Sequence, residues 1–348
     1  MRRHRSIRIT PRDAKLLVRY LDGVEAAVCA RLGSGFNPRE DHLTSLLCEM
    51  LDEKMSELHM LAYPVTKLRE DLAVDHRQLR VSFAIEAKEY PRLPDPRTSA
   101  DLGIVVVYRD HLQPENSFER GALFEAKRLY RSRHSDQYSL YDTFNELRTD
   151  QLLRLAKLEA GESIKKEEAD DDLPWDGRFC FYLFYCPRLE AYEEQAGDDL
   201  RQYSIPWIYD AWGDPFHHWF DRWPDFVGLG PLSEYAADPA RHFPGILSSE
   251  IGWLVGKYLE KDEYGNLTYA LQGMGAKTTV REAYQRLWDQ AWPLSWFIVY
   301  RMLIGRSGCC GKTALEIVRG QDPERNLELG VLPRYVLTLT AGVGVQRG

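Results

Sequence analysis

The sequence predicts an α/β protein, with a mixed β-sheet flanked by helices and an α-rich, aromatic C-terminal extension. Short apolar runs bounded by turn residues, at 102–108 and 121–124, are typical of buried strands. Apolar stripes at helical spacing precede them, and beyond about residue 190 Trp, Tyr, Phe, Pro and Gly become frequent. We therefore expect an N-terminal helical arm over residues 1–35, a core over 36–190 and a mainly helical region over 191–348.

The composition is that of a soluble globular protein. Of 348 residues, 44% are hydrophobic and 28% are charged, and no stretch approaches the roughly 20 apolar residues of a membrane span. The net charge of -8 argues against a protein that coats nucleic acid with a uniform positive field, but it permits a local binding face. Six cysteines, scattered except for Cys309 and Cys310, indicate reduced cytosolic thiols. We expect a cytoplasmic protein without a membrane segment.

The first helix is expected to start near Thr10, which can cap it, with Pro11 at its first position. Its residues at helical spacing form one apolar stripe, and Gly33 is expected to end it. The stripe consists of Leu17, Tyr20, Leu21, Val24 and Val28.

The second helix is expected to be capped by Asn37, with Pro38 at its first position and Glu40 in its first turn. An acid in a first turn interacts favourably with the helix dipole, so Glu40 has a structural interpretation beside a catalytic one. Leu43, Leu46, Leu47, Met50 and Leu51 are expected to face a core.

The stretch from Ser99 to Tyr130 is the most informative part of the chain. Asp101 leads into the run Leu102–Tyr108, polar turn residues follow, and the run Gly121–Phe124 ends in Glu125-Ala126-Lys127. This order predicts a β-hairpin.

The three charged residues of this hairpin predict a cation site. Side chains alternate along a strand, so Glu125 and Lys127 project from one face, about 7 Å apart at backbone level. Such charges are costly in an apolar strand unless they are paired, hydrated or bound to a metal. Magnesium commonly takes one or two protein carboxylates and completes its shell with water and substrate phosphate.

Asp101 followed by Glu125-Ala126-Lys127 resembles the PD-(D/E)XK nuclease superfamily, which has the restriction-endonuclease-like fold. The strings Ser-Ala-Asp-Leu-Gly-Ile and Phe-Glu-Ala-Lys-Arg extend the resemblance, which covers about residues 36–155. Members tend to have a glutamate on a helix before the sheet, and Glu40 matches it. Ala100 stands where the family's name has a proline.

The resemblance implies a role for each matched residue. Asp101 and Glu125 would bind Mg²⁺, for which Mn²⁺ can substitute, and Lys127 would orient the attacking water. Glu40 would assist through a second metal or a bound water, which makes it a further candidate metal ligand.

A second copy of the pattern, Glu86-Ala87-Lys88, ends a strand expected from Val81 to Ile85. No aspartate begins an apolar strand before it, so we favour the copy that contains Glu125. The structural alternative for the favoured copy is a hairpin whose Glu and Lys pair across a solvated face, which contributes little stability.

Basic residues follow the proposed catalytic strand, and Arg128, Arg131 and Arg133 are candidates for contacts with nucleic-acid phosphates. The alternative is a solvated, charged helix start. The resemblance implies a substrate of DNA, although the residues do not distinguish DNA from RNA.

The expected function is that of a metal-dependent nuclease, by analogy a restriction or phage-defence effector. The alternative is an inactive nuclease-fold subunit that binds nucleic acid or acts as a scaffold. The C-terminal region would then bind the target, a partner protein or a second copy of the chain.

After the hairpin we expect an amphipathic helix over 142–160, a charged loop over 162–172 and a strand from Phe179 that completes the sheet. The aromatic residues of 203–253 fit either a pinned irregular segment or a base-stacking surface. A helix over 278–303, broken near Pro293, has aromatic residues every four positions.

The segment Gly311-Lys312-Thr313 lacks the spacing of a phosphate-binding loop, because Arg306 stands where a glycine is required. We expect Gly311 to end a helix and Thr313 to cap the next one. A nucleotide-driven enzyme that uses Lys312 is the third hypothesis.

Overall fold

The computed structural model describes residues 7–33, 38–73, 79–90, 100–132, 135–144, 154–155, 158, 179–187, 191–196, 246–250, 259–261, 267–269, 291–305 and 308–345. Within these ranges, none of the helices combines the length and apolar character that crossing a bilayer requires. All six cysteines fall in these ranges as free thiols, and of these Cys310 is exposed.

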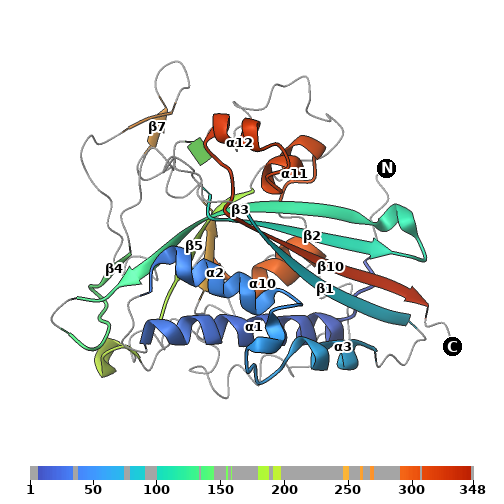
Figure 1. The fold of residues 1–348 in the computed structure, drawn as a ribbon, viewed down its shortest axis with the longest axis horizontal. Helices are drawn as coiled ribbons and strands as arrows, with labels where there is room; N and C mark the ends of the chain where they lie inside the picture. Colours follow the sequence, from blue (N-terminus) through green and yellow to red (C-terminus); the bar gives the residue numbers. More distant parts are fainter. Residues whose placement is uncertain are drawn as a thin grey trace.

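An 8-stranded mixed sheet forms the centre of the molecule (Figure 1). Its strands follow the order β1-β10-β2-β3-β5-β6-β9, and β4 pairs with β3. The β10–β2 and β3–β5 pairs are parallel, and the other pairs are antiparallel. The bounds are β1 Leu79–Glu89, β2 Leu102–Asp110, β3 Phe118–Tyr130, β4 Thr143–Phe144, β5 Cys180–Tyr185, β6 Ile246–Glu250, β9 Ala291–Pro293 and β10 Tyr335–Val345. A separate pair joins β7 (Leu259–Lys261) and β8 (Leu267–Tyr269).

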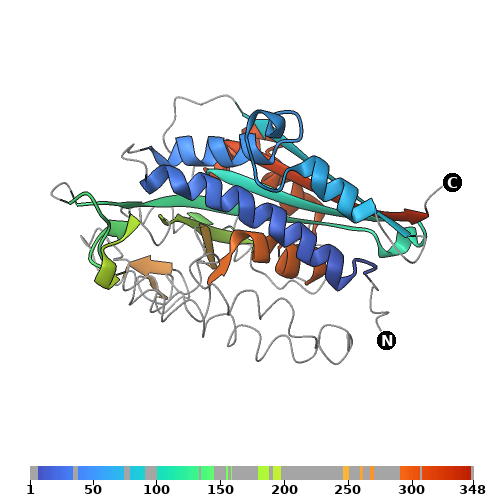
Figure 2. The same cartoon turned by 90° about the horizontal axis from the view of Figure 1, so that it is seen from below.

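Helices cover both faces of the sheet, below and above it in Figure 1. The lower layer contains α1 (Pro11–Gly33), α2 (Glu40–Leu51) and α3 (Val65–Ala73), together with α10 (Leu294–Trp296) and the π-helix η7 (Phe297–Ile304). The upper layer contains α11 (Lys312–Val318) and α12 (Pro323–Leu329). Figure 2 shows the length of α1 along the sheet. Single 3-10 turns span Ser56–Leu58 and Pro114–Asn116.

Alternation along β3 divides its side chains between these two layers. Ala122, Phe124 and Ala126 belong to the core cluster of the α1–α2 layer, whereas Leu123 and Leu129 belong to the cluster on the other face, which includes residues of α11. The strand is therefore buried on both faces, and a charged side chain on it must find its partner inside the protein.

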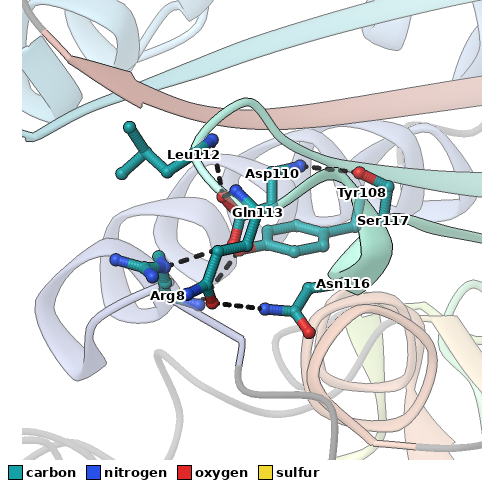
Figure 3. Close-up of polar contacts among 7 residues, drawn as sticks. All are labelled: Arg8, Tyr108, Asp110, Leu112, Gln113, Asn116 and Ser117. Atoms are coloured by element: carbon teal, nitrogen blue, oxygen red, sulfur yellow. Dashed lines mark hydrogen bonds and ion pairs between the residues drawn. The ribbon is translucent and has the colours of Figure 1, made fainter.

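Asp110 organises the turn between β2 and β3 (Figure 3). Its Oδ1 accepts hydrogen bonds of 2.9 Å from the backbone N–H groups of Leu112 and Gln113. The other oxygen, Oδ2, lies 3.2 Å from Nε of Arg8, and the Arg8 N–H donates to the Tyr108 hydroxyl (3.0 Å). The segment before α1 is thereby attached to the hairpin, at the end of β2 opposite Asp101.

The structure confirms the expected hairpin and first helix. Residues 102–108 are all buried in β2, and β3 pairs with β2 in antiparallel register, from Leu102 opposite Phe124 to Tyr108 opposite Phe118. The apolar stripe of α1 is buried. The expected strands after Val81 and Phe179 are β1 and β5.

The second helix starts later than expected. It begins at Glu40 with Arg39 as N-cap, so Pro38 precedes the helix instead of opening it. The five apolar residues expected to face a core are all buried, namely Leu43, Leu46, Leu47, Met50 and Leu51.

The described residues after 190 form strands as well as helices, whereas a mainly helical region was expected. β10 lies between β1 and β2, and β6 and β9 extend the other side of the sheet. The position near residue 190 is therefore no boundary of the sheet. β10 has long-range partners that local patterns do not reveal, because both of its neighbouring strands belong to the first third of the chain.

Three further expectations need correction. Thr143 and Phe144 form β4, whereas a helix was expected from residue 142; residues 154, 155 and 158 are helical. Residues 291–293 form β9, and the helix starts at Leu294. Gly311 is the N-cap of α11 and does not end a helix. The segments 162–172, 203–245 and 278–290 lie outside the described residues.

Candidate active site

Asp101 extends the hydrogen bonding along one edge of β3 by one position beyond the start of β2. Its backbone N–H donates to the carbonyl oxygen of Phe124 (2.8 Å), and its Oδ2 accepts from the N–H of Ala126 (2.7 Å). β2 begins only at Leu102, opposite Phe124, so the strand itself offers no carbonyl to Ala126. The Asp101 carboxyl group therefore continues the hydrogen-bonding pattern for one more position.

Glu40 does the same at the next position along this edge. Its Oε1 accepts from the backbone N–H of Arg128 at 3.0 Å. N–H groups two residues apart on a strand point to the same edge, separated by about 7 Å. Two carboxyl groups, one from the start of β2 and one from the start of α2, thus lie along one edge of β3.

Glu125 and Lys127 form a buried ion pair on the same strand. Nζ of Lys127 lies 2.7 Å from Oε1 of Glu125, and the two residues are 4% and 3% exposed, respectively. Their common strand face was predicted from the sequence. In the other copy, Glu86 and Lys88 are exposed on β1, and Nζ of Lys88 lies 2.9 Å from the hydroxyl of Tyr90.

Electrostatic interactions connect the four candidate residues, Glu40, Asp101, Glu125 and Lys127. Burial and then the charge of Glu125 raise the pKa of Asp101 from 3.8 to about 8, against the opposing effects of Lys127 and the Ala126 N–H. Burial alone would lower the pKa of Lys127, but the negative charges of Glu125, Glu40 and Asp101 raise it above its usual value. Each of the predicted site residues therefore acts on at least one of the others.

Arg128 lies inside the protein rather than on its surface. It is 1% exposed, its guanidinium donates to the carbonyl oxygen of Pro38, and it lies over the Tyr130 ring at 3.8 Å from the centroid. The expectation that Arg128 contacts nucleic acid directly must be corrected, because strand alternation points it at the loop before α2.

Of the other two candidates for phosphate contacts, the described residues include one. Arg131 is partly exposed and donates to the carbonyl oxygen of Asp136 (2.5 Å). Arg133 lies outside the described residues.

The site suits a cation held by two carboxylates rather than three. In the described part of the chain, no three Asp, Glu, His or Cys side chains form a group that could hold a metal ion. Glu40 does not form such a group with Asp101 and Glu125, and its expected role through a second metal or a bound water stays a prediction. Asp101 and Glu125 are enough for Mg²⁺, which often takes only one or two protein carboxylates. The pKa of Asp101 is raised by burial and then by the charge of Glu125, and a divalent cation would offset both effects.

The strand β10 contributes a contact that sequence reasoning missed. The N–H of Tyr335 donates to the carbonyl oxygen of Asp101 (3.1 Å), so the start of β10 fixes the backbone of this residue. The alternating Tyr335-Val-Leu-Thr-Leu-Thr pattern signals a strand, but nothing local signals its neighbour.

The chain was also compared with known proteins. No family model, no curated protein and no solved structure matches it.

Proposed function

We propose that the protein is a metal-dependent nuclease that hydrolyses phosphodiester bonds, with DNA as its substrate. The observation that supports this most directly is the buried Glu125–Lys127 pair, 2.7 Å apart, beside an Asp101 carboxyl group with a raised pKa. Perturbed ionisable groups of this kind are more frequent at functional sites than elsewhere. The sequence resemblance to PD-(D/E)XK nucleases, together with a mixed sheet flanked by helices, suggests the reaction.

In this proposal Asp101 and Glu125 hold Mg²⁺ or Mn²⁺. When bound, the ion supplies charge for the phosphodiester and a more acidic water. Lys127, which remains protonated, orients the attacking water and interacts with the charge that develops on the phosphate. Glu40 acts through its charge on Lys127 and through a bound water. Arg131 and Arg133 attract the nucleic-acid backbone, and a restriction or phage-defence role fits this chemistry by analogy.

A second candidate function is that of a scaffold that keeps a nuclease-like fold without cleavage. It is favoured by the internal contacts of the acids and the lysine. Glu125 pairs with Lys127, Asp101 accepts from Ala126, and Glu40 accepts from Arg128. These contacts are sufficient reason for the residues to be buried even without a reaction.

Replacement of Lys127 separates the two functions. The purified protein is incubated with supercoiled, linear and single-stranded DNA and with RNA, in Mg²⁺ or in EDTA. We expect Mg²⁺-dependent cleavage by the wild type and a loss of about 100-fold or more in Lys127→Met, since removal of one preorganised donor at a developing charge costs about 10²–10³-fold. Affinity for the substrate should remain.

Lys88→Met is the matched control, because Lys88 occupies the same place in an exposed Glu-Ala-Lys string. It should cleave like the wild type. Binding without cleavage by the wild type in every metal tested would establish the scaffold instead. Equal cleavage by Lys127→Met and wild type, with both folded by circular dichroism, would contradict the site.

A further inference from the structure

The first turn of α2 is not held by a cap from its own sequence. Arg39 is the N-cap residue, and its side chain makes no capping hydrogen bond. Helix starts expose N–H groups that need partners, and Ser, Thr, Asp or Asn normally supplies one. The position of this turn, which contains Glu40, must therefore depend on contacts from other elements.

Arg128 supplies such contacts on both sides of the helix start. Its guanidinium donates to the carbonyl oxygen of Pro38, which precedes the helix, and its backbone N–H donates to Glu40 within the first turn (3.0 Å). One residue of β3 thus holds both the approach to α2 and the carboxyl group of its first residue.

The next strand supports the same turn. Tyr185 pairs with Arg128 in the parallel β3–β5 register, and its hydroxyl lies 3.1 Å from Oγ1 of Thr44, one helical turn after Glu40. Both of these side chains are buried. The start of α2 is therefore attached to the sheet at adjacent positions of β3 and β5.

A buried guanidinium is costly unless its surroundings compensate for the lost water. Arg128 obtains part of this compensation from the Tyr130 ring, 3.8 Å from its Cζ, and from the Pro38 carbonyl oxygen. The planar group can stack on the ring and donate in its own plane at once, which a lysine ammonium cannot do.

We propose that Arg128 is a positioning residue, whose side chain tethers the start of α2 so that the Glu40 carboxyl group stays at the edge of β3, on the backbone N–H that follows Lys127. The role in catalysis rests on the proposed nuclease function. The tether itself does not, and it can be measured without any cleavage.

A double-mutant cycle tests the proposal through Glu40. Arg128→Met removes the tether but keeps the backbone N–H, and we expect kcat to fall about 10- to 100-fold with little change in KM, as for a misplaced group. Arg128→Lys should retain part of the activity. In a Glu40→Gln background, Arg128→Met should have almost no further effect, because both changes disable the same group.

Hydrogen–deuterium exchange supplies the second measurement. Amides of residues 40–44, at the start of α2, should exchange about 10-fold faster in Arg128→Met than in the wild type. Exchange of the amides in the sheet should not change. If Arg128→Met does not fold, Arg128→Lys serves for both measurements.

Arg120→Met is the control, because Arg120 is a half-buried arginine on the same strand. Arg120 also lies on β3, donates to the carbonyl oxygens of Met302 and Gly305, and covers the ring of Phe118 at 4.3 Å. Its loss should destabilise the fold without selective exchange at residues 40–44 and without lowering kcat.

Three results would overturn the proposal or its premise. Unchanged exchange at residues 40–44 would eliminate the tether. Additive effects of Arg128→Met and Glu40→Gln on kcat would eliminate positioning through Glu40. A wild type that cleaves no nucleic acid would remove the nuclease function, while the exchange data would still decide whether Arg128 tethers α2.

Discussion

The carboxyl group of Asp101 is subject to opposing influences. Burial and the charge of Glu125 favour its neutral form, whereas Lys127 and the Ala126 N–H favour its anion, and the resulting pKa is about 8. In the metal-free protein this carboxyl group is therefore largely protonated at pH 7. A bound divalent cation would compete with that proton, so its affinity should increase with pH.

Asp101→Asn should change how stability depends on pH. The folded-state pKa is raised above the unfolded value, so the folded protein binds an extra proton between about pH 4 and 8. The contribution of Asp101 to stability is full below about pH 4 and is lost as the pH rises to about 8. An asparagine can still accept from Ala126, and we expect it to stabilise the metal-free protein by about 1–3 kcal/mol at pH 8.

Thermal unfolding at several pH values measures this difference. The advantage of the variant should grow from pH 4 to pH 8 and then level off. Added Mg²⁺ should raise the Tm of the wild type at pH 8 but not that of Asp101→Asn. Parallel stability curves for the two proteins would contradict the raised pKa.

Among the elements, α11 approaches β2 so closely that only glycine fits between them. A Cβ atom added at Gly103 would overlap the backbone carbonyl oxygen of Val318, at the end of α11. Gly121 on β3 also lies against Leu315 and Val318. The two glycines let the helix rest directly on the strand backbones that lead to Asp101 and Glu125.

Gly103→Ala should consequently destabilise the fold by about 1–3 kcal/mol or more, because the clash involves backbone and cannot be relieved by a rotamer change. Gly23→Ala is the matched control. Gly23 lies within α1 with no atom within 4 Å of an added Cβ, so alanine there should stabilise the protein by about 1 kcal/mol. Chemical denaturation measures both, and equal effects of the two substitutions would contradict this packing.

The elements that could be predicted are those whose signals are local. The stripe of α1 and the β2–β3 hairpin, with Asp101, Glu125 and Lys127 on it, follow from periodicity and from charges in an apolar strand. The position of β10 could not be predicted, since its register with Leu102 depends on contacts between distant parts of the chain. Alternation assigns Arg128 to the face of Ala126, but only the Pro38 contact explains its burial.

For the molecule as a whole, side chains and a loop form hydrogen bonds with backbone groups at the β1 edge of the sheet. β1 is the outermost strand on its side in the described chain. Three backbone groups of β1 that point away from β10 have hydrogen-bond partners. The Ala87 N–H donates to Oδ2 of Asp52 (2.8 Å). The Ile85 carbonyl oxygen accepts from the Glu53 N–H (3.1 Å), and the Phe83 carbonyl oxygen accepts from Nε of Arg69 (3.0 Å). Such contacts protect an edge strand from pairing with another chain.

Asp52→Ala combined with Arg69→Ala should therefore promote self-association, since it exposes backbone groups of β1 over its central residues. We expect larger species by light scattering at concentrations where the wild type shows none, and a loss of about 1–3 kcal/mol in stability. Glu57→Ala, at an exposed position nearby, is the control and should behave like the wild type. An unchanged size distribution in the double variant would show that the edge needs no such protection.

The placement of β10 also matters while the polypeptide is being made. β1 emerges early, yet the strand that it pairs with in the sheet is the last one in the described chain. The backbone carbonyl of Asp101 likewise receives its partner only from Tyr335. A nascent chain can form the β2–β3 hairpin, but the gap beside it stays open until translation has passed residue 345. The backbone of Asp101 therefore acquires this partner only after the last strand of the described chain has been synthesised.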